Sequence, residues 1–404
     1  MLSVHEARER ILSHFQKTAS ETLPLTACAN RVLGVDITAQ HDIPLFDNSA
    51  MDGFAIRAED THASPTTLSV VADIPAGATP TVTLAPGQAA RIMTGAQVPA
   101  GANAVIPVED TDVRQHAAGT FAPKTITFTK TLKAGDNVRE RGIDMRAGEI
   151  VLQKGRTLKP QDLGLLATLG MAQVTVHKKP RVALLSSGDE LLTVDAPLES
   201  GKIRDSNSYT LAAAIENAGA DVLRLGVAKD SREAVTALFD QAMHEHVDLI
   251  LSSAGVSVGA FDFIKEVIEA NGSMDFWRVN MRPGKPLAFG SYRGINFIGL
   301  PGNPVSAFVG FEVFVRPVLG QMSGSLDGNR QTVRVRCGED IESDGRESYL
   351  RAKLRSESGI LQAHLTGHQG SGNLLSLVQA DALLIIPAGV KCVPAGQEVF
   401  AILL

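Results

Sequence analysis

The amino-acid sequence predicts a multidomain protein in which an α/β domain with a mostly parallel sheet lies between β-rich regions. Its 404 residues are 44% hydrophobic and 20% charged, which is ordinary for a globular chain of about two to four domains. Strand-like and helix-like segments alternate from residue 180 to about 320, the pattern of a sheet covered by helices on both faces. Short strand-like runs, broken by glycine and proline, fill the chain before and after that segment.

Composition narrows the possible functions. The formal net charge of −6 argues against a large nucleic-acid-binding surface, and no apolar run approaches the roughly 20 residues that span a membrane. Residues 1–15 have the pattern of an amphipathic helix and lack the apolar core of a signal peptide. Cys28, Cys337 and Cys392 are far apart, which suits a reducing compartment and gives no zinc-binding spacing. We therefore expect a cytoplasmic protein without nucleic-acid or membrane partners.

The segments before the α/β domain are predicted as the N-terminal helix, a β-rich region and a second helix. Residues 22–140 contain strand-like runs such as TLSVVADI, NAVIPV and KTITFT, separated by turns with glycine and proline. Residues 158–170 predict a helix with Pro160 near its start and Gly170 at its end. The turn-rich region is typical of an antiparallel sheet.

From residue 180 onward, strands and helices alternate. The expected strands lie at 181–187, 221–227, 247–255, 286–292 and 295–302, and the expected helices at 206–220, 231–245, 263–272 and 303–319. Parallel strands bring their carboxyl ends to one edge of the sheet, where ligands of such domains bind. After Ser325 the chain returns to short strands and turns, which fit a small β-barrel or sandwich.

Two loops near the first predicted strand are rich in polar groups. Residues 186–191 (SSGDEL) follow that strand, and their small side chains let backbone amides approach an anion. Glu190 could hold a cation or cap a helix. Residues 204–208 (RDSNS) precede a helix, although capping alone would use only part of their polar groups. Each loop therefore has a structural explanation beside the functional one.

Three further loops could bind an anion. In residues 252–262 (SSAGVSVGAFD), serines and glycines lie between a buried strand and a helix, so hydroxyl and N–H groups converge where a tetrahedral oxyanion could sit. Asp262 is either a magnesium ligand or a carboxylate that favours the helix N-terminus. Residues 282–286 (RPGKP) place two cations in a stiff turn, and residues 300–307 (LPGNPVSA) turn from strand to helix. Both could also be purely structural turns.

The segment GVSVG also matches the nucleophile elbow of serine hydrolases. Ser257 would be the nucleophile, and an acid and then a histidine would have to follow it in the chain. His364 and His368 are the only downstream histidines, and they lie in the β-rich tail beyond the predicted sheet domain. No HGGG-type oxyanion loop is present. These two observations count against a serine hydrolase, which remains the alternative interpretation of this loop.

Eight stretches, taken together and in order, resemble one enzyme family. They are FDNSAMDGFAIR (46–57), RIMTGAQVPAGANAV (91–105), GDNVRERGIDMRAGE (135–149), SSGDEL, GKIRDSN (201–207), GVSVG (255–259), RPGKP and LPGNPVSA. The chain is identified by this resemblance as a member of the molybdopterin molybdenumtransferase, or molybdenum insertase, family of the MoeA and gephyrin E-domain type. Residues 181–320 alone also resemble the molybdopterin adenylyltransferases, but the β-rich region and the C-terminal strands favour the insertase.

The resemblance implies a reaction and a domain plan. The reaction inserts molybdate into adenylylated molybdopterin and releases AMP, with Mg²⁺ as the cation. The predicted domains are a discontinuous linker domain, a β-rich inserted domain, a three-layer α/β domain and a C-terminal β-barrel. Their expected bounds are 1–26 with 46–53 and 141–178 for the linker, 27–45 with 54–140 for the insertion, 179–325 for the α/β domain and 326–404 for the barrel.

The resemblance also assigns site residues. Asp52, Asp144, Asp205 and Asp262 are expected to be catalytic, and Asp205 and Asp262 to be the metal ligands. The residues expected to bind the pterin substrate or molybdate are Thr94, Arg139, Ser186, Gly188, Glu190, Ser206, Gly255, Ser257, Gly259, Arg282, Lys285, Pro301, Asn303, Arg351 and Ser371. For most of these residues taken singly, a turn, a helix cap or a solvated charge would be explanation enough.

The resemblance also predicts how the chain assembles, and three residues depart from the usual family pattern. The resemblance implies a homodimer whose cleft combines two subunits, with a molybdopterin adenylyltransferase and other cofactor-synthesis proteins as partners. Ala254 replaces a usual glycine, Ala260 replaces a frequent acid, and Arg282 stands where lysine is frequent. The exchange at Arg282 keeps the charge but changes its geometry. A non-catalytic paralogue or scaffold is a further alternative, and the sequence leaves open whether the oxyanion is molybdate or tungstate.

Overall fold

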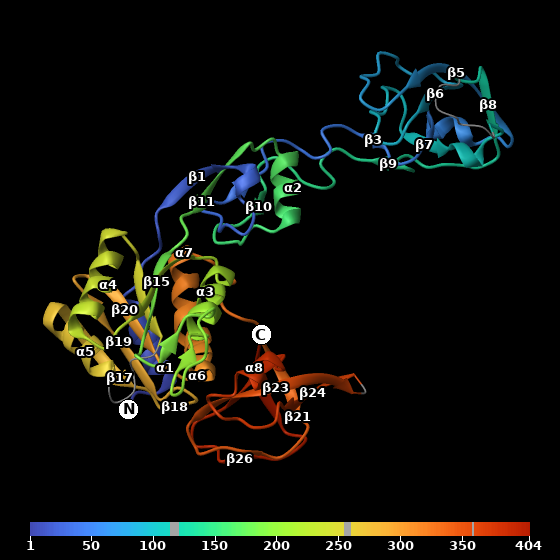
Figure 1. The fold of residues 1–404 in the computed structure, drawn as a ribbon. Coiled ribbons are helices and arrows are strands. Elements are labelled where there is room, and N and C mark those ends of the chain that lie inside the picture. Colours follow the sequence, from blue (N-terminus) through green and yellow to red (C-terminus); the bar gives the residue numbers. More distant parts are fainter. Residues whose placement is uncertain (114–120, 254–259, 358) are drawn as a thin grey trace. The chain divides into compact units, whose positions relative to one another are not determined.

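The computed structural model describes residues 1–113, 121–253, 260–357 and 359–404. The chain forms two compact units, one made of Met1–Val35 with Lys154–Leu404 and the other of Asp36–Gln153. Figure 1 shows their elements. The linker and insertion boundaries expected from the sequence remain predictions, because the second unit contains residues from both expected domains.

The α/β domain is built on a six-stranded sheet of order β15-β12-β16-β20-β19-β17. Four neighbouring strands are parallel: β15 (Asp221–Ala228), β12 (Arg181–Ser187), β16 (Leu249–Ser253) and β20 (Ile295–Leu300). Two antiparallel strands extend one edge: β19 (Pro286–Tyr292) and β17 (Gly272–Arg278). The predicted mostly parallel sheet is confirmed, and its near-continuous apolar runs are those of strands buried on both faces.

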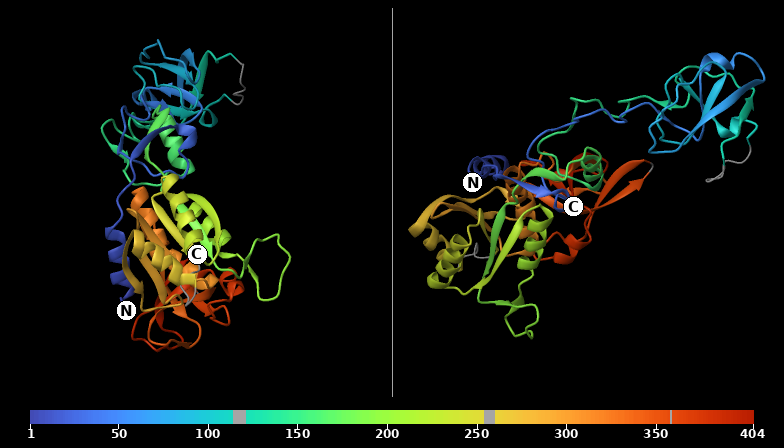
Figure 2. Two further views of the ribbon diagram at one scale, coloured as in Figure 1. Left: turned by 60° about the vertical axis from the view of Figure 1, so that its left-hand side comes forward. Right: turned by 90° about the horizontal axis from the view of Figure 1, so that it is seen from above.

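Helices cover both faces of this sheet (Figures 1 and 2). Alternate residues of β12 divide between two cores, with Val182 and Leu184 in one and Ala183 and Leu185 in the other. The first core is completed by α1 (Val4–Ser13), α3 (Asn207–Asn217), α6 (Pro304–Gly310), η4 (Phe311–Val315) and α7 (Arg316–Ser323). The second is completed by α4 (Arg232–His244) and α5 (Ala260–Asn271). This is the three-layer arrangement that the alternating pattern predicts.

The N-terminal helix belongs to the α/β core. Ser3 and Glu6 form a capping box at its start, which satisfies two of the N–H groups left free at a helix N-terminus. Its buried face, which includes Val4 and Ile11, packs into the first core. The predicted amphipathic helix is confirmed.

A smaller group of elements precedes the α/β domain within the same unit. Its strands β1 (Ser20–Pro24) and β11 (Gln173–His177) pair antiparallel over five residues. The helix α2 (Pro160–Thr168) begins with proline at its first turn, as predicted, and the backbone N–H of Lys159 donates to Asp162. A 3₁₀ turn, η1, follows β1 at Leu25–Ala27.

The C-terminal strands close into a barrel. Their order is β23-β24-β21-β27-β25, and β25 pairs back with β23. These strands are β21 (Thr332–Cys337), β23 (Glu347–Glu357), β24 (Ile360–Leu365), β25 (Ala382–Ile386) and β27 (Glu398–Leu403). The short elements β22 (Ile341–Glu342), β26 (Cys392–Val393) and α8 (Leu374–Val378) complete the domain. Of the barrel and the sandwich, the barrel is therefore observed, and closure leaves few free strand edges.

The unit Asp36–Gln153 contains a five-stranded sheet of order β7-β4-β6-β5-β8. Its strands are β4 (Gly53–Ile56), β5 (Thr66–Ile74), β6 (Gln88–Ile92), β7 (Ala104–Pro107) and β8 (Thr125–Phe128). The shorter elements are β2 (Ile37–Thr38), β3 (Asn48–Ser49), η2 (Ala58–Thr61), η3 (Val108–Asp110), β9 (Val138–Arg139) and β10 (Ile150–Leu152). At Gly53 an added Cβ would lie 2.0 Å from the Ile106 carbonyl oxygen, so only glycine allows this pairing.

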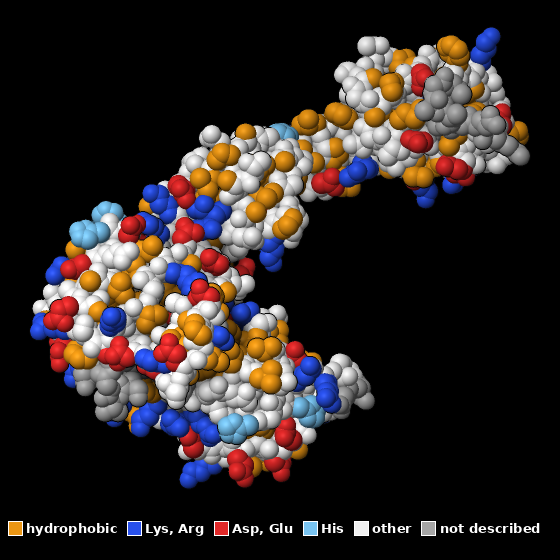
Figure 3. Space-filling view, in the orientation of Figure 1, with side chains coloured by type: hydrophobic (Ala, Val, Ile, Leu, Met, Phe, Trp, Pro, Cys, Tyr) orange, Lys and Arg blue, Asp and Glu red, His pale blue; other side chains and the backbone are white. Residues whose placement is uncertain are grey.

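One helical stretch in the described residues, Pro304–Ser323, is long and apolar enough to span a bilayer, but 83% of it is buried inside the protein. Its middle turn, η4, is π-helical and places Glu312 in the core. Glu312 accepts hydrogen bonds from Arg316 at 2.5 and 3.0 Å and from Arg330 at 3.2 and 3.3 Å. A buried carboxylate needs such partners, because an isolated charge in the interior is strongly destabilising. On the face drawn in Figure 3, by contrast, charges of both signs are interspersed at the surface.

Replacing Glu312 should destabilise the α/β domain. Glu312→Gln removes the carboxylate that pairs with Arg316 and Arg330, so within the described residues Arg316 stays buried without its ion-pair partner. We expect the free energy of unfolding to fall by about 3 kcal/mol, measured by urea denaturation followed by circular dichroism. The control is Glu269→Gln, since Glu269 is 53% exposed in its ion pair with Lys265 and should change stability by less than about 0.5 kcal/mol. Equal effects of the two variants would contradict the buried role of Glu312.

Candidate active site

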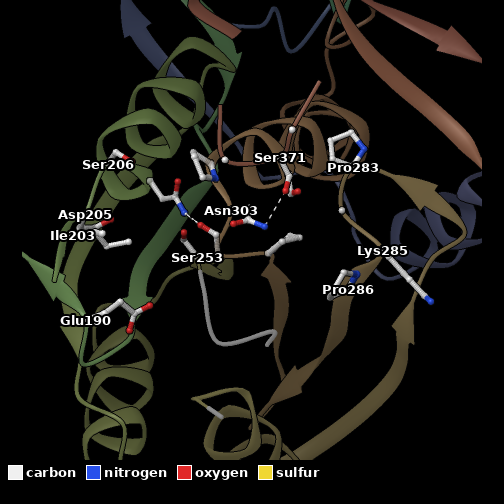
Figure 4. A pocket seen from close by; sticks show the side chains of 18 of the residues that line it. Glu190, Ile203, Asp205, Ser206, Ser253, Pro283, Lys285, Pro286, Asn303 and Ser371 are labelled. Carbon is white, nitrogen blue, oxygen red and sulfur yellow. Dashed lines mark hydrogen bonds between the residues drawn. The ribbon is translucent and has the colours of Figure 1, made fainter. Parts of the chain in front are cut away.

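A cavity of about 990 Å³ lies where the carboxyl ends of β12, β16 and β20 meet the first turns of α3 and α6. Its wall also includes the loop 282–286 and, from the barrel, Arg346 and residues 369–372. Figure 4 shows the side chains that converge on it. A parallel sheet predicts a ligand-binding cavity at this edge, because the carboxyl ends of the strands and the N-termini of the helices leave polar backbone groups there.

Buried serine hydroxyls form the floor of this region. Ser186 pairs in register with Ser253 across β12 and β16, and Ser252 lies beside them. The hydroxyls of Ser186, Ser252 and Ser253 are buried and have no hydrogen-bond partner among the described residues. Ser187 differs, because its hydroxyl donates to Asp230 at 3.2 Å. Buried hydroxyls without partners are destabilising unless a ligand or water satisfies them.

Only part of this serine group borders the cavity. Ser187 and Ser253 line it, whereas the predicted Ser186 lies one residue deeper and is fully buried. Ser187 is the last residue of β12 and Ser253 the last residue of β16, so both stand at the strand ends that the cavity borders.

The SSGDEL turn brings Glu190 to the cavity. Gly188 has φ of +145°, and an added Cβ would lie 2.4 Å from Oε2 of Glu190. The glycine therefore lets the Glu190 carboxylate fold back over the turn. Glu190 lines the cavity, while Gly188 supports it from behind. The two predicted residues thus act together, but only Glu190 is placed to touch a ligand.

Asp205 lies buried at the start of α3. Its Oδ1 accepts the backbone N–H of Ser208 at 3.0 Å, so one oxygen is used as a helix cap. The side chain still borders the cavity, beside Ser206. Asp205 can therefore serve in both of the roles that the sequence left open. It caps α3 through Oδ1, and it can contact a ligand from the cavity side. Asn207 donates to the carbonyl oxygen of Gly302 at 2.7 Å, which joins this turn to the LPGNP loop.

The opposite wall is basic. Arg282, Lys285 and Arg346 line it, and Figure 4 shows the turn with Pro283, Lys285 and Pro286 across the cavity from Glu190 and Asp205, with the Lys285 side chain pointing away from them. Arg282 begins the RPGKP turn, whose first peptide bond, Arg282–Pro283, is cis. Asp230 adds to the acidic side and Arg204 also borders the cavity. A ligand here would therefore lie among both carboxylate and arginine residues.

The LPGNP loop connects the α/β domain to the barrel. Asn303 precedes α6, and its side-chain amide donates to the Ser371 hydroxyl at 3.0 Å. The backbone N–H of Val305 donates to the Ser371 carbonyl at 3.1 Å. Pro301, Asn303 and Ser371 all line the cavity. The structure thus brings these three predicted residues together.

Arg351 occupies a different place from the one expected. It is fully buried in the barrel and is not among the residues that line the cavity. Its guanidinium donates to the Ser376 hydroxyl at 3.1 Å and to the Gly370 carbonyl at 2.9 Å. Burial, and then the charge of Arg282, lower its pKa to about 10. Arg351 therefore supports the 368–372 loop from within rather than lining the cleft.

Four predicted residues belong to the other compact unit. Thr94 donates to Oδ1 of Asp52 through both its backbone N–H and its hydroxyl, each at 2.7 Å. Arg139 and Asp144 form an exposed ion pair at 2.9 Å. Each pair is thus assembled locally, within Asp36–Gln153.

Several expectations fall on residues about which the structure gives no detail. Ala254, Gly255, Ser257 and Gly259 lie outside the described residues. Asp262 lies in α5, but its side chain is not described. Its role as a metal ligand therefore remains a prediction.

Some cavity residues were not among the predicted site residues. Ser187, Asn207 and Ser253 lie in loops that the sequence analysis singled out, whereas Asp230, Arg346 and Gln369 lie outside them. Ser187 and Ser253 stand at the ends of predicted strands, so strand ends alone could have indicated them. Arg346 and Gln369 come from the barrel, and no local pattern says that this domain meets the sheet edge.

The donor chemistry at the acidic wall suits a hard cation. Glu190 and Asp205 offer carboxylate oxygens, the ligand type that Mg²⁺ prefers. Within the described residues, no group of three His, Cys, Asp or Glu side chains could hold a metal by itself. Mg²⁺ usually binds through one or two carboxylates plus substrate phosphates and water, so this set fits a cation that arrives with a phosphate ligand.

Comparison with known proteins identifies the family. The MoeA N-terminal region (domain I and II) matches residues 2–170, a probable molybdopterin binding domain matches 183–321, and the MoeA C-terminal region (domain IV) matches 334–404. The molybdopterin molybdenumtransferase of Nostoc sp. is 38% identical over 95% of this chain and 88% of its own length. The chain belongs to the MoeA family of molybdopterin molybdenumtransferases.

Other MoeA relatives agree along the whole length. Molybdopterin molybdenumtransferase 2 of Mycobacterium tuberculosis is 38% identical over 98% of both chains. The crystal structure of a molybdopterin biosynthesis moeA protein from Pyrococcus horikoshii superposes with a TM-score of 0.84 at 30% identity, and covers 100% of both chains. The family, fold class and enzyme class predicted from the motifs are therefore confirmed, and neither the serine hydrolase nor the scaffold interpretation is supported by these relatives.

Removing the Arg351 guanidinium should loosen the loop that carries Ser371. Arg351→Met keeps a long apolar side chain but removes the hydrogen bonds that the guanidinium donates to the Gly370 carbonyl and the Ser376 hydroxyl. We expect the backbone N–H groups of Val305 and Asn373 to exchange with deuterium about tenfold faster, since a buried hydrogen bond to a charged group contributes at least about 1.4 kcal/mol. Arg355→Met, on an exposed part of β23, is the control. Unchanged exchange at both amides would show that Arg351 does not hold the loop.

Proposed function

We propose that this MoeA-family enzyme inserts molybdate into adenylylated molybdopterin and releases AMP. The observation that carries this proposal is the charge of the cavity lining, which combines the carboxylate residues Glu190 and Asp205 with the arginines Arg282 and Arg346. The substrates have matching chemistry, because molybdate is a dianion and the adenylate carries phosphate groups that bind a divalent cation. The relatives from Nostoc and Mycobacterium are named as molybdopterin molybdenumtransferases, which supports the same reaction.

The basic wall is suited to the oxyanion. Guanidinium groups donate several parallel N–H bonds to oxyanions, and such charge-assisted bonds are stronger than neutral ones. The backbone N–H groups at the start of α6, beside Asn303 and Ser371, add dipoles of the same sign. The Ser253 hydroxyl, which has no partner in the described part of the chain, can donate to a ligand oxygen. These groups can hold a tetrahedral dianion with little rearrangement.

The acidic wall is suited to the cation. Glu190 and Asp205 would hold Mg²⁺ together with phosphate oxygens of the substrate. Mg²⁺ bound there would neutralise phosphate charge and so favour cleavage of the phosphoanhydride. Ser206 and Asn207 lie at the N-terminus of α3, where N–H groups favour an anion. The chain itself would thus act by positioning the phosphates and by stabilising charge.

We also propose that the active form is a homodimer. The paired segments around residues 43–46 and 142–145 expose Leu45 at 56% and Ile143 at 61%, and the N–H of Gly142 donates to the Pro44 carbonyl, which brings the two segments together. Exposed apolar side chains gathered in this way are typical of a protein contact. A dimer would let Asp52, Thr94, Arg139 and Asp144 complete the cavity of a second chain. We expect the dimer to work in the cytoplasm with a molybdopterin adenylyltransferase as its supplier.

The first test separates metal binding by Asp205 from helix capping. Asp205→Asn keeps an oxygen that can accept the Ser208 N–H, but it removes the charge that a cation needs. We expect molybdate-dependent AMP release to fall about 100-fold and the Mg²⁺ concentration for half-maximal rate to rise. The measurement is AMP release from adenylylated molybdopterin at varied Mg²⁺.

The matched control is Asp221→Asn, since Asp221 is 61% exposed and lies at the start of β15, on the edge opposite to the cavity. An Asp205→Asn enzyme with unaltered Mg²⁺ dependence would show that Asp205 only caps α3. No molybdate-dependent AMP release by the unmodified dimer would overturn the proposed reaction itself.

A second test asks whether two chains build one site. Asp52→Asn and Asp205→Asn change different compact units, so a mixed dimer would contain one site with both residues intact. Coexpression of the two inactive variants should restore about a quarter of the unmodified activity, since half of the dimers are mixed and each has one intact site. The separately purified variants provide the baseline. Mixed dimers without recovered activity would show that the site does not combine these residues from two chains.

A further inference from the structure

Two arginines from different domains lie beside each other at the basic wall. Arg282 belongs to β18 (Met281–Arg282), and Arg346 immediately precedes β23 of the barrel. β18 pairs in parallel with the start of β23, at Glu347 and Ser348, and Nη1 of Arg346 donates to the Met281 carbonyl at 3.0 Å. Both arginines are among the residues that line the cavity. Like charges this close repel one another, so the arrangement needs an anion.

That anion is Asp344. Its Oδ2 accepts from Nε of Arg346 at 3.0 Å and from Nη2 at 2.6 Å, and the same oxygen lies 3.9 Å from Nη1 of Arg282. Its Oδ1 accepts the backbone N–H of Arg346 at 3.1 Å, which fixes the orientation of the carboxylate. Asp344 is not among the residues that line the cavity. It therefore contacts both arginines without itself bordering the cavity.

The cluster of Arg282, Arg346, Arg351 and Asp344 carries more positive than negative charge. The Arg346 hydrogen bonds come first among the causes that hold the pKa of Asp344 below its ordinary value, and the charge of Arg282 adds to them. The carboxylate is therefore ionised at neutral pH. Arg351, buried in the barrel, also experiences the charge of Arg282. Three arginines and one carboxylate leave a surplus that a dianionic ligand at the cavity wall would offset.

We propose that Asp344 is a positioning residue that holds Arg282 and Arg346 together as one oxyanion-binding pair. The proposal rests on the function proposed above and names the residue that aligns the two domains at the oxyanion end of the cavity. Asp344 touches no substrate. It acts by fixing the two guanidinium groups at a spacing that repulsion would otherwise widen.

Removing the charge of Asp344 has two opposite effects. The wall becomes more positive, which favours an anion, but this gain is small because Asp344 is 37% exposed and screened by water and salt. The arginines also lose their common acceptor and their alignment, which weakens charge-assisted hydrogen bonds to the oxyanion. The second effect should dominate, because precise alignment of several donors contributes more than one screened charge.

The test compares Asp344→Asn with Asp344→Glu and with Glu342→Gln. Glu342 is exposed on β22, two residues away, so its variant removes one charge from the same domain. In Asp344→Asn the KM for molybdate should rise about tenfold, with kcat and the KM for adenylylated molybdopterin nearly unchanged. Asp344→Glu, which keeps the charge, should recover most of the molybdate affinity, and Glu342→Gln should behave as the unmodified enzyme. Thermal unfolding checks that every variant folds.

Direct titration with molybdate by calorimetry keeps this test separate from the proposed reaction. A tenfold weaker Kd in Asp344→Asn supports the positioning role, even if AMP release is absent and the proposed reaction fails. An unchanged or lower KM and Kd for molybdate would overturn it. A fall in kcat with unchanged molybdate affinity would also overturn it, since that result indicates a general structural role.

Discussion

The junction between the parallel sheet and the barrel is the constraint on which the candidate site depends. Two strand residues of β18 pair with β23, and Ser371 is bonded to Asn303 and Val305 at the start of α6. Tyr349, Leu377 and Leu383 of the barrel are buried in the α/β core. Apolar burial provides the attraction, while the directional hydrogen bonds fix how the domains meet. Without this contact, the cavity would lack Arg346, Gln369 and Ser371.

Near this junction, the barrel interior contains a fully buried arginine, Arg351. Arg351 has no carboxylate among its hydrogen-bond partners in the described residues, and its Nη1 is buried without an acceptor there. Its remaining bonds go to a hydroxyl and to backbone carbonyls, which keeps the surrounding positive charge uncompensated. A buried cation in that state is destabilising for the fold. The Gly370 carbonyl that accepts from Arg351 belongs to the loop that lines the cavity, so this arginine supports the cavity wall without lining it.

The parallel sheet also places polar groups at the cavity, opposite the residues that come from the barrel. The hydroxyls of Ser186, Ser252 and Ser253 are held at the strand ends by register, where apolar residues would pack better. Glu190 and Asp205 reach the same edge because a glycine turn and a helix cap direct them there. Rigid strands and helix N-termini thus hold the polar groups, which gives the site a nearly fixed geometry before any ligand arrives.

The sequence by itself determined the family, the mostly parallel sheet and the loops that carry Glu190, Asp205, Arg282, Lys285 and Asn303, because strand periodicity and local turn chemistry are encoded by neighbouring residues. Tertiary structure alone decided that Arg346 lines the cavity and that Arg351 does not. It also decided that Ser187, rather than Ser186, lines the wall. These outcomes depend on strand pairing and domain contact between residues far apart in the chain, which local patterns do not specify.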